Sequence, residues 1–484
     1  MVFSSHLFLF YFLPAALLVY YLMPRWGKHL ALTGLSYIFY GWANPLFVVL
    51  MFLSTIIDYF AGLVISRQFS ASWKEPIRAL PHGEPRSRAQ KIAVIVSVCS
   101  NLSLLGFFKY FNFATSNYNG LVTALGLGQW GVDAITITLP LGISFYTFQS
   151  MSYSIDVYRG DARAIRNFID FACYVSMFPQ LVAGPIIRFQ EVDDQLRHRT
   201  YTAEKFARGA AFIAMGLAKK VLLANPCGKV ADTCFDAGSI GFVDSWFGAV
   251  AYAFQIYFDF SGYSDMAIGL GLILGFVFPK NFDSPYHSAS ITEFWRRWHL
   301  SLSTWLRDYL YIPLGGNRKG EGRTYVNLAL VMLLGGLWHG ASWNFVIWGG
   351  IHGAMLAVER MQGKQSFYHS LPKALRVTIT FFIVCVAWVF FRAPTLPEAL
   401  RYCGSLFGAN GAQGGGALIA GLIYQPYYLI MMGLAAVITW TCPQTWDFTR
   451  RMQWWKVPVI FGAFLVAVLV LTTQEFNPFI YFIF

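Results

Sequence analysis

Charged residues are scarce in this chain of 484 residues. Asp, Glu, Lys and Arg together make up 12% of it, whereas soluble domains carry roughly 25%. Hydrophobic residues make up 56% and aromatic residues 18%. This balance excludes an ordinary soluble globular protein and predicts an all-α polytopic membrane protein.

Cysteine is present but lacks the spacings that carry chemistry. Cys99, Cys173 and Cys385 lie within apolar runs, and the closest pair, Cys227 and Cys234, fits no zinc pattern. No C-x-x-C or Cys/His metal motif occurs in the sequence. We therefore expect neither a structural metal nor a disulfide framework.

Acidic residues are outnumbered by basic ones, which gives a formal net charge of +12. The Lys and Arg residues are scattered in short loops between apolar segments instead of forming a nucleic-acid patch. Retention of basic loops in the cytoplasm explains this distribution. We expect membrane lipids as surroundings and no nucleic-acid partner.

Few of the hydrophobic segments are long enough and uninterrupted enough to be simple transmembrane spans. Residues 1–23 lack a basic n-region and a clear cleavage site, so we expect a retained first span with an outer N-terminus. Many later segments are shorter than about 20 residues or contain Gly or Pro, which predicts helices that enter the membrane only partway. The further apolar segments are 30–43, 45–66, 92–108, 135–155, 168–187, 207–224, 246–275, 325–338, 343–358, 377–391, 417–440 and 457–473.

Polar segments orient the chain. The loop 67–91 is rich in Lys and Arg and should be cytoplasmic. Basic residues near 360–376 and 450–456 mark further inner loops, which leaves the aromatic C-terminal tail 476–484 on the outer side. There it would be an exposed docking element. Apart from the Gly-rich loop 408–416, no long low-complexity tract interrupts the chain. We therefore predict a single transmembrane domain over 1–484, with its core motifs within 140–360.

The run 291–312 differs from the surrounding apolar segments. At helical spacing its apolar residues form one broad arc, with His299 at the edge, while Arg296, Arg297 and Arg307 lie opposite. The bilayer core penalises each ionised group by a few kcal/mol or more. We therefore predict an amphipathic helix that lies at an interface or lines a wet cavity.

Three histidines in apolar surroundings, His299, His339 and His352, are candidates for chemistry. His339 lies among Gly335, Gly336 and Gly340, and an ionisable group at membrane depth is a functional candidate. A neutral imidazole can take a proton from a hydroxyl, which contributes roughly 10²–10⁴ in rate. The alternative is a buried histidine that bonds a backbone carbonyl. His352, thirteen residues later, does not share a helical turn with His339, so a metal pair is not expected, and packing near a helix end is its alternative.

Two carboxylates and several basic residues complete the candidates. Asp259 and Asp265 lie six residues apart in an apolar stretch that Gly262 interrupts; we expect them to pair with Arg or His and to orient cavity residues. Glycosyl chemistry by the two carboxylates is the alternative. Arg188 is placed to meet a phosphate from the cytoplasm, as are Arg318 and Lys319, although basic loops need no further explanation.

Long motifs in the chain resemble the membrane-bound O-acyltransferase family, and most closely its bacterial branch that acetylates exopolysaccharides such as alginate. The resemblance extends from residue 1 to about 400. The motifs that carry it are Met1-Val-Phe-Ser-Ser5, Leu141-Gly-Ile-Ser-Phe-Tyr146, Ile155-Asp-Val-Tyr-Arg-Gly160, Gln255-Ile-Tyr-Phe-Asp-Phe-Ser-Gly-Tyr-Ser-Asp-Met-Ala-Ile-Gly269, Phe294-Trp-Arg-Arg-Trp-His299 with Leu314-Gly-Gly-Asn-Arg-Lys-Gly320, and Gly335-Gly-Leu-Trp-His-Gly340.

The resemblance implies that His339 and His299 are catalytic. It also implies a ring of about 11 transmembrane helices with short re-entrant and amphipathic helices around a central tunnel. Residues expected to support the site or line the tunnel are Trp298, Arg296, Arg297, Asp259, Tyr263, Asp265, Arg188, Asn317, Trp338 and His352.

The implied activity is transfer of an acetyl group across the bacterial inner membrane. The donor would be acetyl-CoA or an acetylated carrier, with no bound cofactor. The acceptor would be a polysaccharide, alginate or cellulose, or a periplasmic SGNH-type acetyltransferase that works with the polysaccharide synthesis machinery. His339 would act as the base, and His299 would polarise the carbonyl or help the base. A glycan or lipid-linked sugar transporter, and a polytopic glycosyltransferase, are the alternatives.

Overall fold

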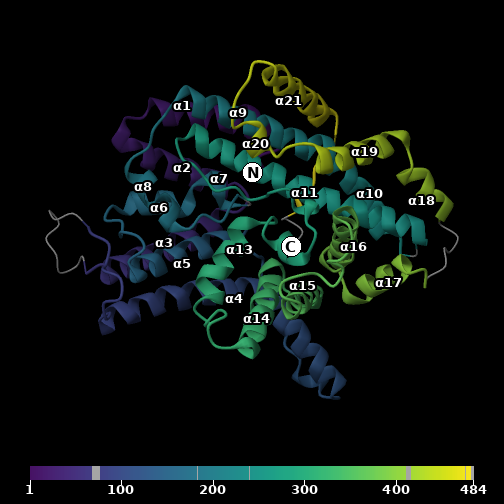
Figure 1. Ribbon diagram of the computed structural model, residues 1–484. Helices are drawn as coiled ribbons and strands as arrows, with labels where there is room; N and C mark the ends of the chain where they lie inside the picture. The colour runs from purple at the N-terminus through teal and green to yellow at the C-terminus, as the bar shows by residue number, and fades with distance from the viewer. Residues whose placement is uncertain are drawn as a thin grey trace. The chain divides into compact units, whose positions relative to one another are not determined.

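The computed structural model describes residues 1–67, 77–133, 135–182, 184–238, 240–409, 416–474 and 476–480. Every regular element in these ranges is a helix (Figure 1), which confirms the all-α prediction. The chain packs into two compact units, Met1–Thr202 with Leu274–Phe278 and Ala203–Ile273 with Pro279–Phe484. The single domain over 1–484 stays a prediction. Parts of the loops 67–91 and 408–416, and residues 481–484 of the tail, lie outside the described residues.

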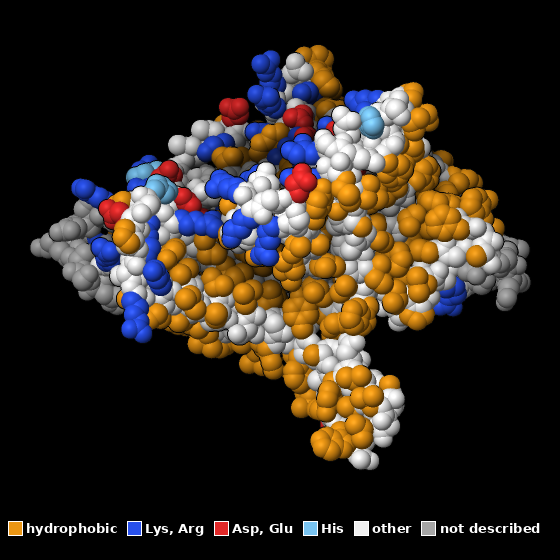
Figure 2. Space-filling view, turned by 60° about the horizontal axis from the view of Figure 1, so that its bottom comes forward, with side chains coloured by type: hydrophobic (Ala, Val, Ile, Leu, Met, Phe, Trp, Pro, Cys, Tyr) orange, Lys and Arg blue, Asp and Glu red, His pale blue; other side chains and the backbone are white. Residues whose placement is uncertain are grey.

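Within the described ranges, four helices are long and apolar enough to cross a membrane: α3 (Pro45–Ile65), α4 (Arg88–Ala124), α16 (Lys373–Arg392) and α21 (Lys456–Thr473). Figure 2 shows broad hydrophobic areas on the face in view, with Lys and Arg side chains gathered together rather than dispersed among them. Long apolar helices with exposed hydrophobic side chains indicate a multi-pass membrane protein. The number of about 11 spans stays a prediction.

The first unit is built from short and long helices. Gly62 of α3 lets Tyr153 of α5 approach, because an added Cβ there would collide with the tyrosine hydroxyl. The predicted segment 135–155 is helical only from Ile143, since Pro140 and the left-handed Gly142 (φ 73°) precede it. Its elements are η1 (Leu7–Phe12), α1 (Leu13–Leu22), η2 (Arg25–Gly27), α2 (Lys28–Gly41), α3, α4, η3 (Gly128–Trp130), α5 (Ile143–Arg159), α6 (Phe168–Ser176), α7 (Phe178–Leu181) and α8 (Phe189–Arg197).

The second unit holds the remaining helices, around a core rich in aromatic side chains. Its elements are α9 (Ala203–Ala218), η4 (Lys219–Ala224), α10 (Asn225–Phe235), α11 (Phe242–Ile273), η5 (Pro285–His287), α12 (Ile291–Trp295), α13 (Leu300–Leu306), η6 (Arg307–Tyr311), α14 (Glu321–His339), α15 (Trp343–Met361), α16, α17 (Leu396–Leu406), α18 (Gly416–Ile423), α19 (Pro426–Thr441), α20 (Thr445–Phe448) and α21.

Helix α11 is continuous through Gly262, so the predicted break at this glycine is wrong. Gly262 instead lets α11 approach α9 closely: an added Cβ would lie 2.7 Å from the carbonyl oxygen of Gly216. Two helical turns further along α11, Gly269 packs against Gly209 of α9 in the same way. The glycines therefore allow close packing of the two helix backbones. Both carboxylates lie on one continuous helix.

The run 291–312 is not one amphipathic helix. It divides into α12, α13 and the π-helix η6, and the break is at His299, which adopts a left-handed conformation (φ 44°, ψ 55°). The peptide groups at the break bond a distant loop: Leu300 N–H donates to the Asn281 carbonyl oxygen, and Asp283 N–H donates to the Arg297 carbonyl oxygen. These bonds replace the helical ones that the periodic pattern predicted.

Two further predicted segments divide in the same manner. The segment 168–187 is interrupted at Met177, between α6 and α7, and Pro179 is accepted because it lies in the first turn of α7. The segment 417–440 contains α18 and α19, and Pro426 begins the second of these helices. Proline at each restart fits the first turn of a helix but not its interior.

Candidate active site

His339 is the last residue of α14, at a very tight contact between α14 and α15. An added Cβ on Gly336 would collide with the carbonyl oxygen of Phe345, and one on Gly340 would collide with the Phe345 ring. The two glycines therefore let the start of α15 press against the end of α14. This contact fixes the position of the His339 side chain, which is 8% exposed.

Aromatic rings surround His339. Ring centroids lie 4.9 Å away at Trp338, 5.2 Å at Trp348 and 5.1 Å at Phe391, in each case edge-on. Such walls exclude bulk water and lower the local dielectric, which strengthens any electrostatic interaction inside the site. His299 is also near, with 6.5 Å between the two imidazole centroids.

His299 is fully buried and oriented by Asn281. Its Nδ1 lies 3.2 Å from Asn281 Oδ1, which also accepts hydrogen bonds from the Ser301 backbone N–H and hydroxyl. Since Oδ1 is an acceptor there, Nδ1 of His299 must donate, which leaves Nε2 unprotonated in the neutral ring. Within the described part of the chain Nε2 has no hydrogen-bond partner. Burial lowers the pKa of His299 to about 3, so the ring is neutral at physiological pH.

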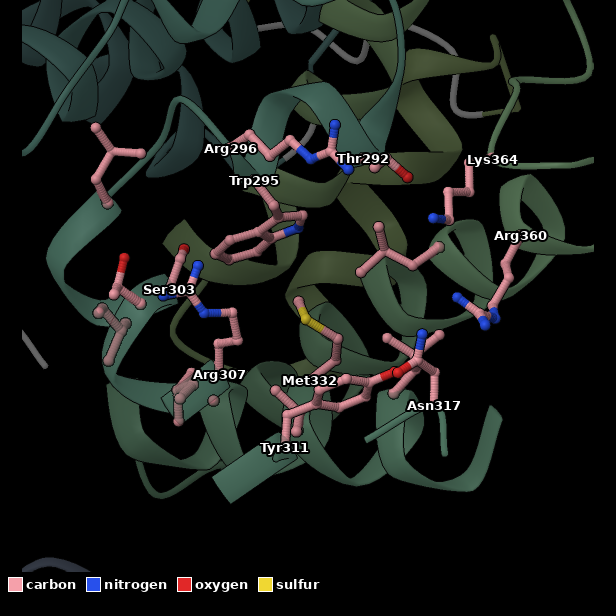
Figure 3. A pocket seen from close by; sticks show the side chains of 18 of the residues that line it. Thr292, Trp295, Arg296, Ser303, Arg307, Tyr311, Asn317, Met332, Arg360 and Lys364 are labelled. Carbon is pink, nitrogen blue, oxygen red and sulfur yellow. The ribbon is translucent and has the colours of Figure 1, made fainter. Parts of the chain in front are cut away.

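A cavity of about 590 Å³ reaches His339. Helices α13, η6, α14 and α15 supply most of its wall, and Trp295, Met332 and Trp348 are among the lining residues. Figure 3 shows Trp295 and Met332 facing the open space, with polar side chains around them. A pocket of this size suits a small organic ligand.

The charges in this cavity have one sign. Arg296, Arg307, Arg360 and Lys364 contribute to its lining, and no Asp or Glu does. Arg307 pairs with Asp308 at 2.7 Å. Arg296, Arg360 and Lys364 are labelled in Figure 3, and across the ranges that the structure describes they make no ion pair. The cavity therefore offers three uncompensated cations to an anionic ligand.

A second, much smaller cavity touches His339 from another set of residues. Its wall comes from α11, α16, the His299 region and the C-terminal tail. The tail residue is Ile480, which is 2% exposed, and Phe479 is 3% exposed. For these described positions, the predicted exposed docking tail is wrong, because the tail packs into the second unit. The lining residues are Ile256, Phe260, Trp298, His339, Trp388, Phe391 and Ile480.

The predicted tunnel residues of the second unit have different surroundings. Arg296 and Asn317 line the large cavity, whereas Trp298 lines the small one. Arg297 instead pairs with Glu293 at 2.9 Å. Trp338 is buried against both catalytic candidates, with its ring centroid 6.1 Å from that of His299.

His352 is buried beside the large cavity without lining it. Its ring centroid lies 5.2 Å from that of Trp295 and 4.9 Å from that of Trp348. Neither ring nitrogen has a hydrogen-bond partner among the residues with described positions. His352 thus supports the two tryptophans by packing and makes none of the hydrogen bonds that usually accompany a buried histidine.

The carboxylates of α11 pair with lysines, so the prediction of Arg or His partners is wrong. Asp259 Oδ1 lies 2.9 Å from Lys220 Nζ, and Asp265 Oδ2 lies 2.7 Å from Lys219 Nζ. Both lysines belong to the π-helix η4, which follows α9. The sequence spacing revealed the carboxylates but not their partners, which come from a different helix.

Four further predicted residues do not line the large cavity. Tyr263 of α11 is buried against Phe479, at 4.4 Å between centroids. Arg188 belongs to the first unit, where it pairs with Glu191 at 2.6 Å. Arg318 and Lys319, predicted to meet a phosphate, are not part of the cavity wall.

Sequence reasoning missed two residues that hold the site. Asn281 orients His299, and Glu359 of α15 accepts hydrogen bonds from the backbone N–H groups of Ile291 (2.7 Å) and Thr292 (2.8 Å) at the start of α12. Glu359 is fully buried. A carboxylate in the apolar pattern of 343–361 was the available signal, since a buried charge needs partners.

Comparison with known proteins identifies the family of the chain. The family model described as "MBOAT, membrane-bound O-acyltransferase family" matches residues 161–394. The chain is 43% identical to the probable alginate O-acetylase AlgI of Pseudomonas putida, over 100% of both chains. It is 48% identical to the Azotobacter vinelandii protein of the same name, over 84% of this chain and 78% of the relative. Identity to the peptidoglycan O-acetyltransferase of Helicobacter pylori is 37%, over 85% and 80%.

The chain belongs to the membrane-bound O-acyltransferase family. Within the family it falls in the alginate-type branch of O-acetyltransferases, so the predicted resemblance and the predicted enzyme class are confirmed. This membership favours acyl transfer over the transporter and glycosyltransferase alternatives.

Proposed function

We propose that the chain moves an acetyl group from a cytoplasmic thioester donor to a hydroxyl group on the far side of the bacterial inner membrane. The acceptor is an exopolysaccharide, alginate or cellulose, or a periplasmic SGNH-type relay protein that completes the transfer. The proposed body is a ring of about 11 spans around a central tunnel. Names of the relatives support a polysaccharide acceptor, with alginate ahead of cellulose.

The observation that carries the proposal is the cavity that joins three uncompensated cations to His339. Acetyl-CoA and an acetylated carrier protein both bear phosphate at the end of a long flexible arm that terminates in the thioester. Guanidinium and ammonium groups bind phosphate through charge-assisted hydrogen bonds. The arm would extend along the cavity, and the thioester would meet His339.

In the proposed reaction His339 takes the proton of the acceptor hydroxyl as the oxygen attacks the thioester carbonyl carbon. A C–O bond forms and the C–S bond breaks; the departing sulfur then receives the proton from His339, which regenerates the neutral ring. The hydrogen bond to Asn281 leaves Nε2 of His299 as an acceptor only. This geometry supports the predicted role of His299 in helping the base over the predicted polarisation of the carbonyl.

The decisive experiment is acetyl transfer by the purified chain in lipid nanodiscs. Labelled acetyl-CoA is the donor, and free thiol and transferred label are measured, with an acetylated carrier protein as a parallel donor. His339→Ala should reduce turnover by at least about 10²-fold, the size of a general-base contribution. His369→Ala is the control, because His369 is exposed and outside both cavities.

Cells give an independent readout of the same variant. His339→Ala should abolish acetylation of the polymer while polymer secretion continues. Loss of secretion itself would contradict the proposal and favour a transport role. Equal turnover by the His339→Ala and wild-type chains would also contradict it.

A further inference from the structure

The C-terminal tail ends its described course beside the catalytic candidates. Ile480 shares the small cavity with His339, Trp298 and Phe391. Phe479 packs its ring on Tyr263, with 4.4 Å between centroids. The tail therefore forms part of the wall next to His339, on a side different from the basic cavity.

A buried ion pair holds the backbone of this tail. Asp259 Oδ2 accepts a hydrogen bond from the Ile480 N–H at 2.9 Å, and Lys220 Nζ donates to the Pro478 carbonyl oxygen. The same two side chains pair with each other at 2.9 Å and are at most 3% exposed. Both contacts are to main-chain atoms, two residues apart, so the pair recognises the direction of the tail and not its side chains.

Stability alone gives a weak reason for such a pair. Removing two charges from water costs several kcal/mol for each ion, and a buried pair often contributes nothing beyond an apolar replacement. A buried pair is tolerable when further hydrogen bonds satisfy the remaining lone pairs and protons. Here the tail backbone supplies those bonds, which links the pair to the position of the tail.

The π-helix η4 presents the lysine. In a π-helix the extra residue per turn shifts the side chains relative to an α-helix, and such turns are frequent at functional sites. Lys219 and Lys220 are adjacent in η4, yet they reach Asp265 and Asp259, which lie six residues apart on α11. Asp265 accepts its other hydrogen bond from Thr445, not from the tail.

We propose that Lys220 and Asp259 are positioning residues for acyl transfer: they clamp the backbone of residues 478–480 so that the tail forms the acceptor-side wall of the His339 site. The role of His339 in this statement rests on the proposed function. The pair touches neither donor nor acceptor; it acts through the tail. The clamp requires an acceptor at residue 259 and a donor at residue 220.

Two double variants test whether the tail depends on the donor at residue 220 and the acceptor at residue 259, or only on the ion pair between them. Lys220→Gln with Asp259→Asn removes both charges but keeps a donor and an acceptor in their places. Lys220→Asp with Asp259→Lys keeps the ion pair but reverses the pattern that the tail backbone meets. Chymotrypsin cleavage after Phe476 and Phe479, followed by mass spectrometry, measures release of the tail, and acetyl-thioester turnover measures function.

The reversed pair should increase tail cleavage and reduce turnover at least about tenfold, the scale for loss of a hydrogen bond to a charged group. The amide pair, Lys220→Gln with Asp259→Asn, should show a smaller increase in tail cleavage and a smaller loss of turnover. As a matched control, reversal of the neighbouring pair, Lys219→Asp with Asp265→Lys, should leave tail cleavage as in the wild type. The proposal is overturned if the reversed Lys220 and Asp259 pair keeps the tail protected, or if the amide pair releases the tail more than the reversed pair does.

A variant within the tail leaves the Lys220 and Asp259 side chains unchanged. Ile480→Pro removes the backbone N–H that donates a hydrogen bond to Asp259, whereas Ile480→Val keeps it. Proline should increase cleavage after Phe476 and reduce turnover more than valine does. Cleavage after Phe476 is the readout for this pair, because chymotrypsin does not cut a bond that precedes proline. Equal behaviour of the two variants would overturn the clamp. Tail cleavage also separates this proposal from the catalytic one, because His339→Ala should lose turnover with the tail still protected.

Discussion

His299 illustrates how one hydrogen bond decides what a histidine can do. The Asn281 side chain fixes the proton on Nδ1 and leaves Nε2 as a bare acceptor. The left-handed backbone at His299, rare for a residue with a Cβ, turns the ring away from the helical path of α12. The residue is thus specified by a loop some twenty positions earlier in the chain.

The pH dependence of stability should report this burial. His299 has a pKa of about 3 in the folded chain and about 6.5 when exposed. Below pH 6.5 the unfolded chain therefore binds a proton that the folded chain refuses. The contribution to stability is complete above pH 6.5 and falls as pH decreases toward 3, by about 2 kcal/mol at pH 5.

His299→Asn removes this titration. In detergent, the melting temperature of the wild type should fall more between pH 7.5 and pH 5 than that of the variant. Subtracting the change in melting temperature of the variant from that of the wild type removes the contribution of the other titrating groups. An identical shift in both proteins would show that His299 titrates in the ordinary range and that its surroundings are wetter than the structure indicates.

Single residues were predictable from sequence where unusual neighbours mark them. His339 stands in Gly335-Gly-Leu-Trp-His-Gly340, and the structure explains the glycines by the contact with Phe345. Asn281 carries no such mark, because an asparagine in a loop is ordinary. Its importance arises from the side chains that the fold brings to it, which no local pattern records.

At the scale of elements, the packing of α14 against α15 depends on glycine. Gly336→Ala would place a methyl group against the Phe345 carbonyl oxygen, so α15 must shift away from His339. Overpacking of this kind costs about 1–3 kcal/mol. We expect a lower melting temperature and a loss of turnover that exceeds the loss of donor affinity.

Gly322→Ala is the matched control in the same helix. No atom lies within 4 Å of a Cβ added at Gly322, and alanine is the better helix former by up to about 1 kcal/mol. This variant should be as stable as the wild type or more so. A stable, active Gly336→Ala protein would instead show that the two helices separate at little cost.

Elements were predictable where apolar periodicity is uninterrupted, as in α11 and α16. They were not predictable where tertiary contacts override periodicity. The run 291–312 has an unbroken helical pattern, yet backbone bonds to Asn281 and Asp283 divide it. Glu359 adds a second constraint by capping α12 from α15. Both constraints come from residues distant in sequence, and a local window contains neither.

At the scale of the whole molecule, the excess of positive charge has a specific location. Part of it is expected in cytoplasmic loops, but the large cavity collects cations without acidic partners in its lining. Composition alone gave the sign of the charge and the membrane class. It could not distinguish Arg360 and Lys364, which line the cavity, from Arg318 and Lys319, which do not.

The proposed donor-binding role of these cations predicts a salt effect. Arg360→Gln with Lys364→Gln should raise the KM for acetyl-CoA about tenfold or more, with a smaller change in kcat. Salt should raise the KM of the wild type more than that of the variant, because screening weakens the interaction that the variant lacks. Steady-state kinetics at several salt concentrations measures both effects.

Arg318→Gln with Lys319→Gln is the control for general surface charge. It removes the same net charge from outside the cavity, so the KM should change little. An equal rise in KM for both double variants would contradict a phosphate site in the cavity and attribute the effect to the overall field of the protein.

The three uncompensated cations also have a consequence for the reaction cycle. In the proposed function they bind the phosphate end of the donor, which is unchanged when the acetyl group leaves, so the spent thiol form would bind nearly as well as the acetylated form. The spent donor would then compete with the acetylated donor for the cavity. The rate of acetylation in the cell would follow the ratio of acetylated to free donor and not the concentration of the acetylated form alone, which couples modification of the polymer to the metabolic state of the cytoplasm.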